Sequence, residues 1–400
     1  MSVIMERSTA MPHPTLVLAI ATAAQNLAIG LTFGAFGLLI ADLAVTFEAG
    51  RSQLSLGIAL VSLVMGLLSP VLGLLLDRWS IRGTMLLGIL LASAGFLLAS
   101  MAMSLPVFLG AYGLLVGGGI TGFGVLPAGK LAANWFPQAT GRALGIVSLP
   151  ILVALGPPLF GWILEMSGWR TLLRIFAGTC LCLAPFLLLL RDFPQGAAEV
   201  AGPAPREPGE GWQTTLADSR LWLLVVIGGA MFSGGIVLVT HVVQHALQLG
   251  ISLPRASLLL SINGLAAIAG AALFGWLADR LRPTGALAVN LGLQALVWPF
   301  LLLQEGLPGL ALATVLLGLC GGGAHPALSA LLGRIYGARR FGAMLGLLTL
   351  LVIPFNFGAA PIAGLVFDRS GSYAPAFLLL SGFAVLGLLL TFVLKRRLST

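Results

Sequence analysis

The chain has 400 residues, of which 58% are hydrophobic and only 8% are charged, and it carries a formal net charge of +8. A water-soluble protein needs about 25% charged residues to keep its surface hydrated, so this composition excludes a soluble globular protein. The basic residues stand singly between apolar runs, which excludes the clustered basic surface that binds nucleic acid. No nucleophile with a base, metal-ligand cluster or phosphate-binding loop can be recognised, so we expect neither an enzyme nor a site for a metal or another cofactor.

Twelve apolar runs follow one another along the chain. A helix needs about 20 apolar residues to cross the hydrocarbon core of a bilayer, and each run approaches or exceeds that length. The runs cover about 16–40, 53–76, 83–104, 107–133, 142–163, 169–190, 221–247, 254–278, 284–303, 308–333, 341–366 and 374–394. We therefore predict an all-α membrane protein, embedded in a lipid bilayer, whose twelve transmembrane helices form two six-helix bundles over residues 1–190 and 221–400.

One long polar stretch, residues 191–220, separates the two sets of six runs. It is rich in glycine and proline and cannot bury a core of its own, so we interpret it as a linker. Its last part, residues 212–220, mixes apolar and charged residues. This mixture favours a short helix that lies at the membrane interface.

Positive charge is divided unevenly between the two ends of these runs. Fifteen Lys and Arg residues fall on the side that holds both termini and the linker, and five fall on the other side. Because short cytoplasmic loops collect Lys and Arg, we expect both termini and the linker to be cytoplasmic, with the chain in the inner cell membrane. The first run lacks a small-residue cleavage site, so we expect it to remain as a helix.

The two halves of the chain share three matches at an offset of 201 to 203 residues. The matches are Gly73–Arg78 with Gly275–Arg280, residues 158–168 with 361–371, and Trp135 with Tyr336. Apolar helices resemble one another by chance, but chance would not also match the acids at their ends. The matches therefore indicate an internal duplication.

A Gly-x-x-x-Asp-Arg turn ends both the second and the eighth run. Glycine allows two helices to approach closely, the Asp can accept hydrogen bonds from a neighbouring helix N-terminus, and the Arg can pair with an acid across the gap. Such contacts can form in one conformation and break in another. We predict a cytoplasmic gating motif made of Gly73, Asp77, Arg78 and Arg82 in the first half and Gly275, Asp279 and Arg280 in the second.

With this repeated turn, the sequence resembles the major facilitator superfamily over its whole length, because that family repeats the loop after its second and eighth helices. The resemblance implies the major facilitator fold, in which two six-helix bundles rock around a central site and give alternating access. It also implies that helices one, four, seven and ten line the cavity. In the second copy of the turn, Arg282 and Pro283 replace the expected spacing.

Several stretches look like the bacterial monocarboxylate and oxalate/formate porter branch of that superfamily. They are Phe33-Gly34-Ala35-Phe36, Asn134-Trp135-Phe136 leading to Arg142-Ala143-Leu144-Gly145, Gly168-Trp169-Arg170 and Gly371-Ser372-Tyr373. The chain departs from the branch at three positions where members often carry an arginine, an acid and a lysine; these positions are Ala271, Ala267 and Gly37. The usual clamp for a carboxylate is therefore not visible.

Polar residues inside the apolar runs are the candidates for a substrate or proton path, because an ionisable group in hydrocarbon costs about 3 kcal/mol or more. They are Gln25, Asn26, Lys130, His241, His245, Asn263, His325 and Asn356. Each also has a structural interpretation. His245 can be a solvated helix end, Lys130 can extend to the headgroups, and the amides and the other two histidines can fix helix packing.

Three functions remain open. The first is a secondary transporter of a small organic anion of the monocarboxylate kind, with protons as the candidate coupling ion because histidine titrates near neutral pH. The second is an efflux pump for neutral or amphipathic compounds, which the alanine at position 271 favours. The third is a membrane receptor that keeps the fold without transport. For the first two we expect a small-molecule substrate, and we expect the protein to act as a monomer.

Overall fold

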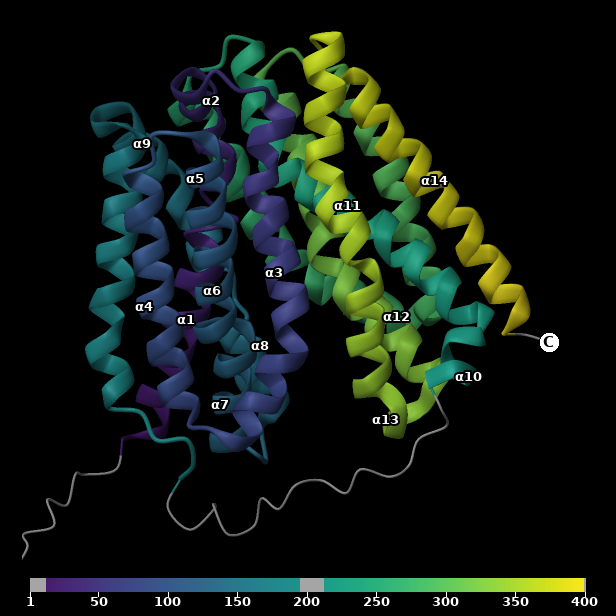
Figure 1. Ribbon diagram of the computed structural model, residues 1–400. Helices are drawn as coiled ribbons and strands as arrows, with labels where there is room; N and C mark the ends of the chain where they lie inside the picture. Colours follow the sequence, from purple (N-terminus) through teal and green to yellow (C-terminus); the bar gives the residue numbers. More distant parts are fainter. Residues whose placement is uncertain (1–11, 195–211, 399–400) are drawn as a thin grey trace, which may run out of the picture.

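The computed structural model describes residues 12–194 and 212–398, and all regular secondary structure within these two ranges is helical (Figure 1). The first bundle contains α1 (Pro14–Gly30), α2 (Phe36–Phe47), α3 (Arg51–Arg78), α4 (Ile81–Ser100), α5 (Leu105–Leu109), the π-helix η1 (Gly110–Val116), α6 (Gly117–Phe123), α7 (Val125–Trp135), α8 (Thr140–Val147) and α9 (Ile151–Leu188). The short α10 (Trp212–Ala217) precedes the second bundle, which contains α11 (Ser219–Gln248), α12 (Leu253–Leu302), α13 (Leu307–Ser370) and α14 (Ala374–Arg397).

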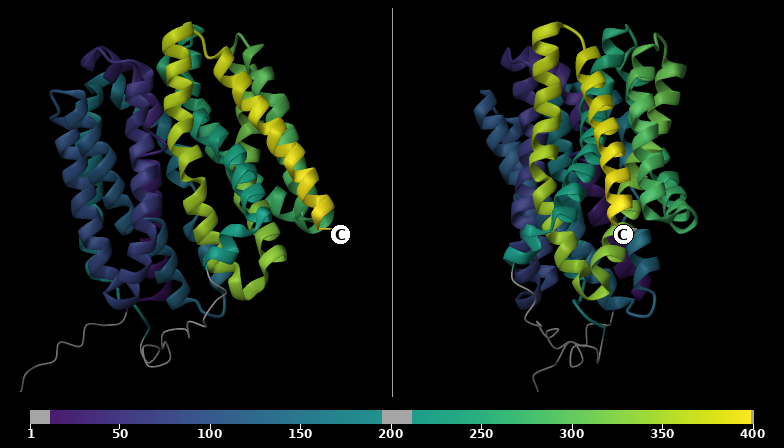
Figure 2. Two further views of the ribbon diagram at one scale, coloured as in Figure 1. Left: turned by 45° about the vertical axis from the view of Figure 1, so that its right-hand side comes forward. Right: turned by 90° about the vertical axis from the view of Figure 1, so that its right-hand side faces the viewer.

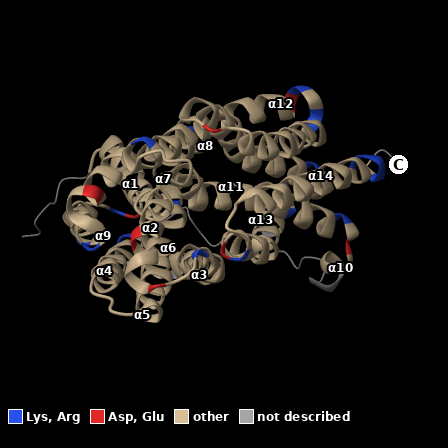
Figure 3. Cartoon of the chain, turned by 90° about the horizontal axis from the view of Figure 1, so that it is seen from above, with Lys and Arg blue, Asp and Glu red and all other residues tan. Residues whose placement is uncertain are grey.

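Nine helical stretches in the described ranges are long and apolar enough to cross a membrane. Two of them, Arg142–Leu188 and Leu253–Leu302, contain a break in helical geometry and cross twice, while α1 and α2 together make one further passage. The prediction of twelve passages in two six-helix bundles is confirmed for this part of the chain. Figure 3 shows the charged residues mainly at helix ends and turns, as a lipid-solvated exterior requires.

Two expected elements differ in length from the prediction. The first passage does not end near residue 40, because α2 continues to Phe47 and carries the half-buried Asp42 inside the helix. The predicted short helix over residues 212–220 is present as α10 but ends at Ala217. Asp218 is the N-cap residue of α11, and its side chain accepts a hydrogen bond from the backbone nitrogen of Arg220.

The helix ends define two faces of the molecule. The start of α1, the ends of α9 and α14, and the start of α11 lie together at the lower end in Figure 1, which we call the linker face. The end of α2, the middle of α9 and the start of α14 lie at the opposite end, which we call the distal face. Figure 2 shows the same arrangement from two further sides.

Sharp junctions between consecutive passages depend on a positive φ angle. Gly168 (φ 74°, ψ 167°) and Gly337 (φ 72°, ψ 169°) interrupt α9 and α13, and glycine adopts this backbone without strain. Arg282 has nearly the same geometry (φ 64°, ψ 155°) inside α12, although it carries a side chain. This region is essentially restricted to glycine, so the α12 junction is strained.

The two bundles pack against each other through α3 with α13 and α9 with α12. Small residues allow these helices to approach closely: a Cβ atom on Gly264 would lie 2.9 Å from the backbone nitrogen of Ala154, and one on Gly364 would lie 2.6 Å from that of Ser52. The half of α3 near the distal face includes fully buried residues such as Ile58 (0% exposed), whereas the half near the linker face includes exposed residues such as Leu68 (37% exposed). The cover over α3 is therefore tighter toward the distal face.

Candidate functional site

An acid from the second bundle caps the first helix turn of α3 at the distal face. The first amides of a helix have no partner within that helix, and the helix dipole favours an anion beside them. The carboxylate of Asp368 accepts hydrogen bonds from the backbone nitrogens of Arg51 and Ser52, both at 2.9 Å. This contact joins the end of α13 to the start of α3, and thus one bundle to the other.

The side chain of Arg51 continues the same contact. Its guanidinium donates a 2.6 Å hydrogen bond to the hydroxyl oxygen of Tyr373 and lies 3.7 Å from the centre of the Phe367 ring. Tyr373 is buried, and burial raises its pKa to about 12. The hydroxyl therefore keeps its proton at neutral pH and can donate a hydrogen bond in turn.

That hydroxyl faces His241, which is fully buried on α11. The Nδ1 atom of His241 lies 3.1 Å from the hydroxyl of Tyr373, and its Nε2 atom lies 2.9 Å from the carbonyl oxygen of Ala360 and 3.4 Å from the hydroxyl of Ser55. We call Arg51, Ser55, His241, Asp368 and Tyr373 the distal gate. His241, for which the sequence leaves both a substrate or proton path and helix packing open, lies in this interface between the bundles.

A second contact closes the same end between α2 and α11. Gln244 donates a 3.0 Å hydrogen bond from its side-chain amide to the carbonyl oxygen of Gly37. A Cβ atom on Gly37 would overlap the carbonyl oxygen of Val239. In the monocarboxylate and oxalate/formate porter branch the position of Gly37 often carries a lysine. Here the backbone of α11 occupies the space that such a side chain would need.

His245 lies one turn beyond His241 and is half-buried rather than solvated. The edge of its ring faces Phe377, with ring centres 5.4 Å apart, and its Nε2 atom has no hydrogen-bond partner among the described residues. An unpaired buried nitrogen is costly, so His245 is a candidate for a contact that this conformation does not make.

The other deep histidine lies in a cavity within the second bundle. His325 is exposed to it, and the ring of Phe232 lies 4.5 Å from the imidazole, centre to centre. The cavity has a volume of about 80 Å³ and is lined by Phe232, His325, Leu328, Ser329, Leu345, Leu348, Thr349, Val352 and Asn356. We call it the α13 cavity. The buried Oδ1 atom of Asn356 has no partner among the described residues, so the cavity offers a free polar atom beside an imidazole.

The two amides on α1 have different surroundings. Asn26 accepts a 2.9 Å hydrogen bond from the backbone nitrogen of Leu152 and donates another to Thr22, which makes it a packing group between α1 and the start of α9. Gln25 lines a cavity of about 40 Å³ with Ser148, and its buried Oε1 atom has no partner in the described part of the chain. Only Gln25 of the pair is thus free to bind a solute.

Lys130 and Asn263 are placed by neighbouring helices. Lys130 donates a 2.7 Å hydrogen bond to the carbonyl oxygen of Leu76, in the last turn of α3, where the helix dipole favours a cation. Asn263 packs against α13, since a Cβ atom on Gly318 would lie 3.1 Å from its side-chain oxygen.

The described part of the predicted gating motif lies at the linker face, where the backbone nitrogen of Arg82 donates a 3.0 Å hydrogen bond to the carboxylate of Asp192. Added Cβ atoms on Gly73 and Gly275 would meet nothing within 4 Å, so the close helix approach expected at these glycines is not found. Arg82, Asp279 and Arg280 are exposed, with Arg280 over the Trp276 ring at 5.7 Å, and the side chains of Asp77 and Arg78 lie outside the described part.

Repeat-related aromatic residues hold the two ends of the linker. Trp135 donates a 2.8 Å hydrogen bond from its indole nitrogen to the carbonyl oxygen of Arg191, just after α9. Tyr336, its match in the second half, donates a 2.9 Å hydrogen bond to the carboxylate of Asp218, just before α11. Burial would raise the pKa of Asp218, but the hydrogen bonds from Arg220 and Tyr336 outweigh burial and lower it.

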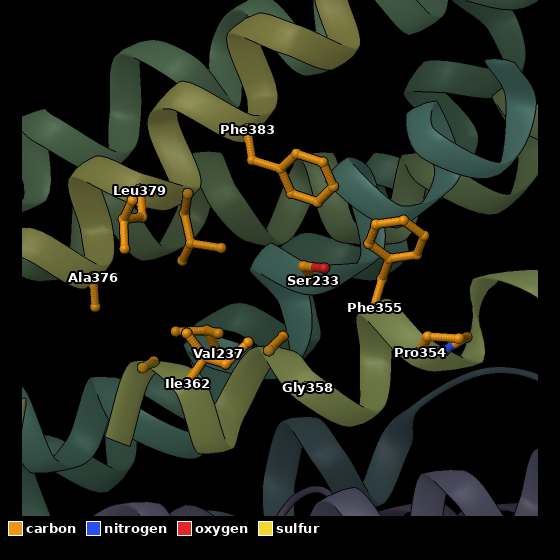
Figure 4. A pocket seen from close by; sticks show the side chains of 12 residues that line it. Ser233, Val237, Pro354, Phe355, Gly358, Ile362, Ala376, Leu379 and Phe383 are labelled. Atoms are coloured by element: carbon orange, nitrogen blue, oxygen red, sulfur yellow. The ribbon is translucent and has the colours of Figure 1, made fainter. Parts of the chain in front are cut away.

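A larger apolar cavity of about 290 Å³ lies between α11, α13 and α14 (Figure 4). Phe355 and Phe383 face it from α13 and α14, and Ser233 supplies a hydroxyl from α11. Its walls can hold an apolar molecule, but they offer little to orient a charged one.

Sequence reasoning missed most of the distal gate. Asp368 falls only within the repeat match of residues 158–168 with 361–371, and Tyr373 only within the stretch Gly371-Ser372-Tyr373 that carries the family resemblance. One signal could have identified the contact: Asp368 is an acid at the end of one helix, and the first amides of another helix on the same face, α3, need an acceptor. The sequence does not show which helix N-terminus Asp368 caps, because that depends on how the two bundles dock.

The fold and these polar groups define a membrane transporter built of two bundles. A model of the Major Facilitator Superfamily matches residues 22–303 and 242–399, and the chain belongs to that family. Monocarboxylate transporter 11 of Mus musculus is 28% identical over 378 residues, covering 90% of this chain and 83% of that protein. Monocarboxylate transporter 13 of Bos taurus is 26% identical over 368 residues, covering 89% and 84%.

Solved structures confirm the fold. A bacterial homolog of the human lysosomal transporter Spinster, in an inward-facing and unoccupied conformation, superposes with a TM-score of 0.77 at 17% identity, covering 97% of this chain and 98% of that one. The nucleoside transporter NupG superposes with a TM-score of 0.77 at 13% identity, covering 96% of this chain and 100% of that one.

Proposed function

We propose that the protein carries a small organic anion of the monocarboxylate kind by alternating access. The observation that carries this proposal is the α13 cavity, where His325 and Asn356, whose Oδ1 atom is unpaired, stand beside the apolar Phe232 and Leu348. A carboxylate needs hydrogen-bond donors at one end and an apolar wall for its alkyl part. Imidazole, amide and the hydroxyl of Ser329 can supply the donors. The similarity to monocarboxylate transporters supports the same substrate class.

The cavity also limits substrate size. About 80 Å³ accommodates a few heavy atoms, whereas drug-sized ligands occupy pockets of roughly 300 Å³ or more. A monocarboxylate of two to four carbons fits this limit. In our proposal His325 donates to the carboxylate, Asn356 orients it, and Phe232 packs on the alkyl part.

We further propose that the linker face is cytoplasmic and that the protein sits in the inner cell membrane as a monomer. The excess of Lys and Arg at that face supports this orientation. The distal gate is closed, while Gly73 and Gly275 have open space around them, so the conformation would be inward-facing. Residues 1–190 and 221–400 would be the two moving bodies, and 191–220 the cytoplasmic linker.

Uptake of labelled lactate into proteoliposomes, with acetate, pyruvate and formate as competitors, tests this function. His325→Gln and Asn356→Leu should each raise the KM for lactate at least about tenfold, as loss of a buried hydrogen bond to a charged group does. Asn263→Leu, at a packing amide, is the control and should lower stability without changing KM. Wild-type protein that transports no monocarboxylate would refute the proposal.

A second candidate is efflux of neutral or amphipathic compounds, which the apolar cavity between α11, α13 and α14 favours. A thermal-shift screen separates the two candidates, because a ligand stabilises in proportion to ln(1 + [L]/Kd). Stabilisation by lipophilic cations, but not by monocarboxylates, would select the efflux function. The variant Gly358→Trp, which fills that cavity, should then remove the shift.

A further inference from the structure

We propose that His241 is a proton-binding site that controls the distal gate: the gate closes around a neutral imidazole, and a proton taken up at Nδ1 from the distal side holds it open. This inference rests on the alternating access of the proposed function but not on the identity of the solute.

The hydrogen-bond directions in the closed gate are fixed by chemistry. A carbonyl oxygen can only accept, so the Nε2 atom of His241, 2.9 Å from the carbonyl of Ala360, must carry a hydrogen. In a neutral ring Nδ1 then has a lone pair, and the Tyr373 hydroxyl at 3.1 Å donates to it. The oxygen of Tyr373 in turn accepts from Arg51 at 2.6 Å. Every hydrogen in this chain has one acceptor.

A proton added at Nδ1 of His241 disrupts this chain of hydrogen bonds. The new Nδ1–H points at the Tyr373 oxygen, so the hydroxyl hydrogen of Tyr373 must turn away and loses its acceptor. Arg51 and the imidazolium would then both donate to one oxygen, with two positive charges beside each other. A buried donor without a partner and two neighbouring cations both disfavour the closed gate.

The other groups around His241 do not offset the added charge. The charged groups that act on it are Arg51 and Asp368, and its titratable neighbours are Tyr373 and His245. The carboxylate of Asp368 is the one acid in this set, and both of its oxygens already accept backbone hydrogens of α3. The arrangement is thus complete only with a neutral ring.

The distal gate also controls whether a proton from solution can reach His241. His241 is fully buried and Tyr373 is 1% exposed, so the imidazole can exchange protons with the distal solution only after the gate opens. In the open gate solvent reaches the ring, and the ordinary pKa of a solvated histidine side chain is about 6.5. Protonation of the open form alone multiplies the open-to-closed ratio by about ten between pH 7.5 and pH 5.5.

Distances between nitroxide labels on Val45→Cys and Ser252→Cys, at the distal ends of the two bundles, report this ratio without any substrate. In lipid nanodiscs, the wild-type gate should show the roughly tenfold rise in the open population from pH 7.5 to pH 5.5. His241→Gln keeps a donor and an acceptor but cannot titrate, and its ratio should change less than about twofold over that range. His13→Gln, at the start of α1 on the linker face, is the control and should keep the full response.

Tyr373→Phe gives a second readout. It keeps the ring stacked on Phe377 but removes the hydroxyl that a neutral Nδ1 needs, so the open population at pH 7.5 should already rise severalfold. A pH-independent wild type, a His241→Gln variant with the full response, or a Tyr373→Phe variant with wild-type ratios would each overturn the inference. Since no solute is present, these results stand apart from the lactate test.

Discussion

The carboxylate of Asp368 caps α3 across the two bundles, with 2.9 Å between its Oδ1 atom and the backbone nitrogen of Arg51. Asp192 makes a contact of the same kind with the start of α4, at 2.8 Å from the backbone nitrogen of Ile81, but within one bundle. Both acids thus cap a helix N-terminus, but the two caps have different consequences. The first links two bodies that alternating access requires to separate, and the second stabilises one of them.

Asp368→Asn should therefore shift the conformational equilibrium. An anion at a helix N-terminus contributes about 1 kcal/mol, so its loss should raise the open population of the distal gate about fivefold. The nitroxide distances described above measure this change. Asp192→Asn is the matched control, and it should lower unfolding stability by a similar amount without changing the gate; equal gate populations in the two variants would contradict the assignment.

Gly37→Ala should hold the distal gate open. The added methyl group would overlap the carbonyl oxygen of Val239, and a backbone atom cannot move aside as a side chain can. We expect transport to fall at least about tenfold, because the barrier to closure rises by more than about 1.4 kcal/mol. Gly235→Ala on α11 is the control, since a Cβ atom there meets nothing within 4 Å. Normal transport by Gly37→Ala would show that the two backbones separate more easily than their packing implies.

Asn26→Leu should destabilise the first bundle rather than weaken substrate binding. It removes the acceptor of the Leu152 amide at the start of α9, and a buried N–H without a partner costs about 1–3 kcal/mol. Unfolding in mixed detergent micelles measures the loss. The neighbouring Gln25→Leu change removes an unpaired oxygen, so it should leave stability unchanged or improve it.

Arg282→Gly should stabilise the protein, because it relieves a backbone geometry that glycine adopts freely. Strain of this kind costs about 1–3 kcal/mol, and the entropy that glycine loses on folding leaves a gain of about 1 kcal/mol. Arg282→Ala keeps the strained backbone and removes the side chain beyond Cβ, so it separates the two effects. Equal unfolding midpoints for the glycine and alanine variants would place the effect in the side chain instead.

The sequence predicts the twelve passages because length and hydropathy are local properties. It misplaces the end of the first passage, because the charge of Asp42 suggests a loop although helix packing keeps α2 continuous to Phe47. The sequence marks the histidines as unusual, yet only helix packing within the second bundle places His241 beside Tyr373 and leaves His325 in a cavity. Contacts between residues 317 positions apart, such as Arg51 with Asp368, depend on the docking of the two bundles and have no local signal.

The contacts of Trp135 and Tyr336 show where one bundle of this protein can be joined to a bundle of a relative. Trp135 fastens the chain to the first bundle at Arg191, and Tyr336 fastens it to the second bundle at Asp218. Each bundle therefore carries its own anchoring contact, and a junction placed between Pro194 and Trp212 cuts neither of them. A hybrid that combines one bundle of this protein with the other bundle of a relative should be joined there.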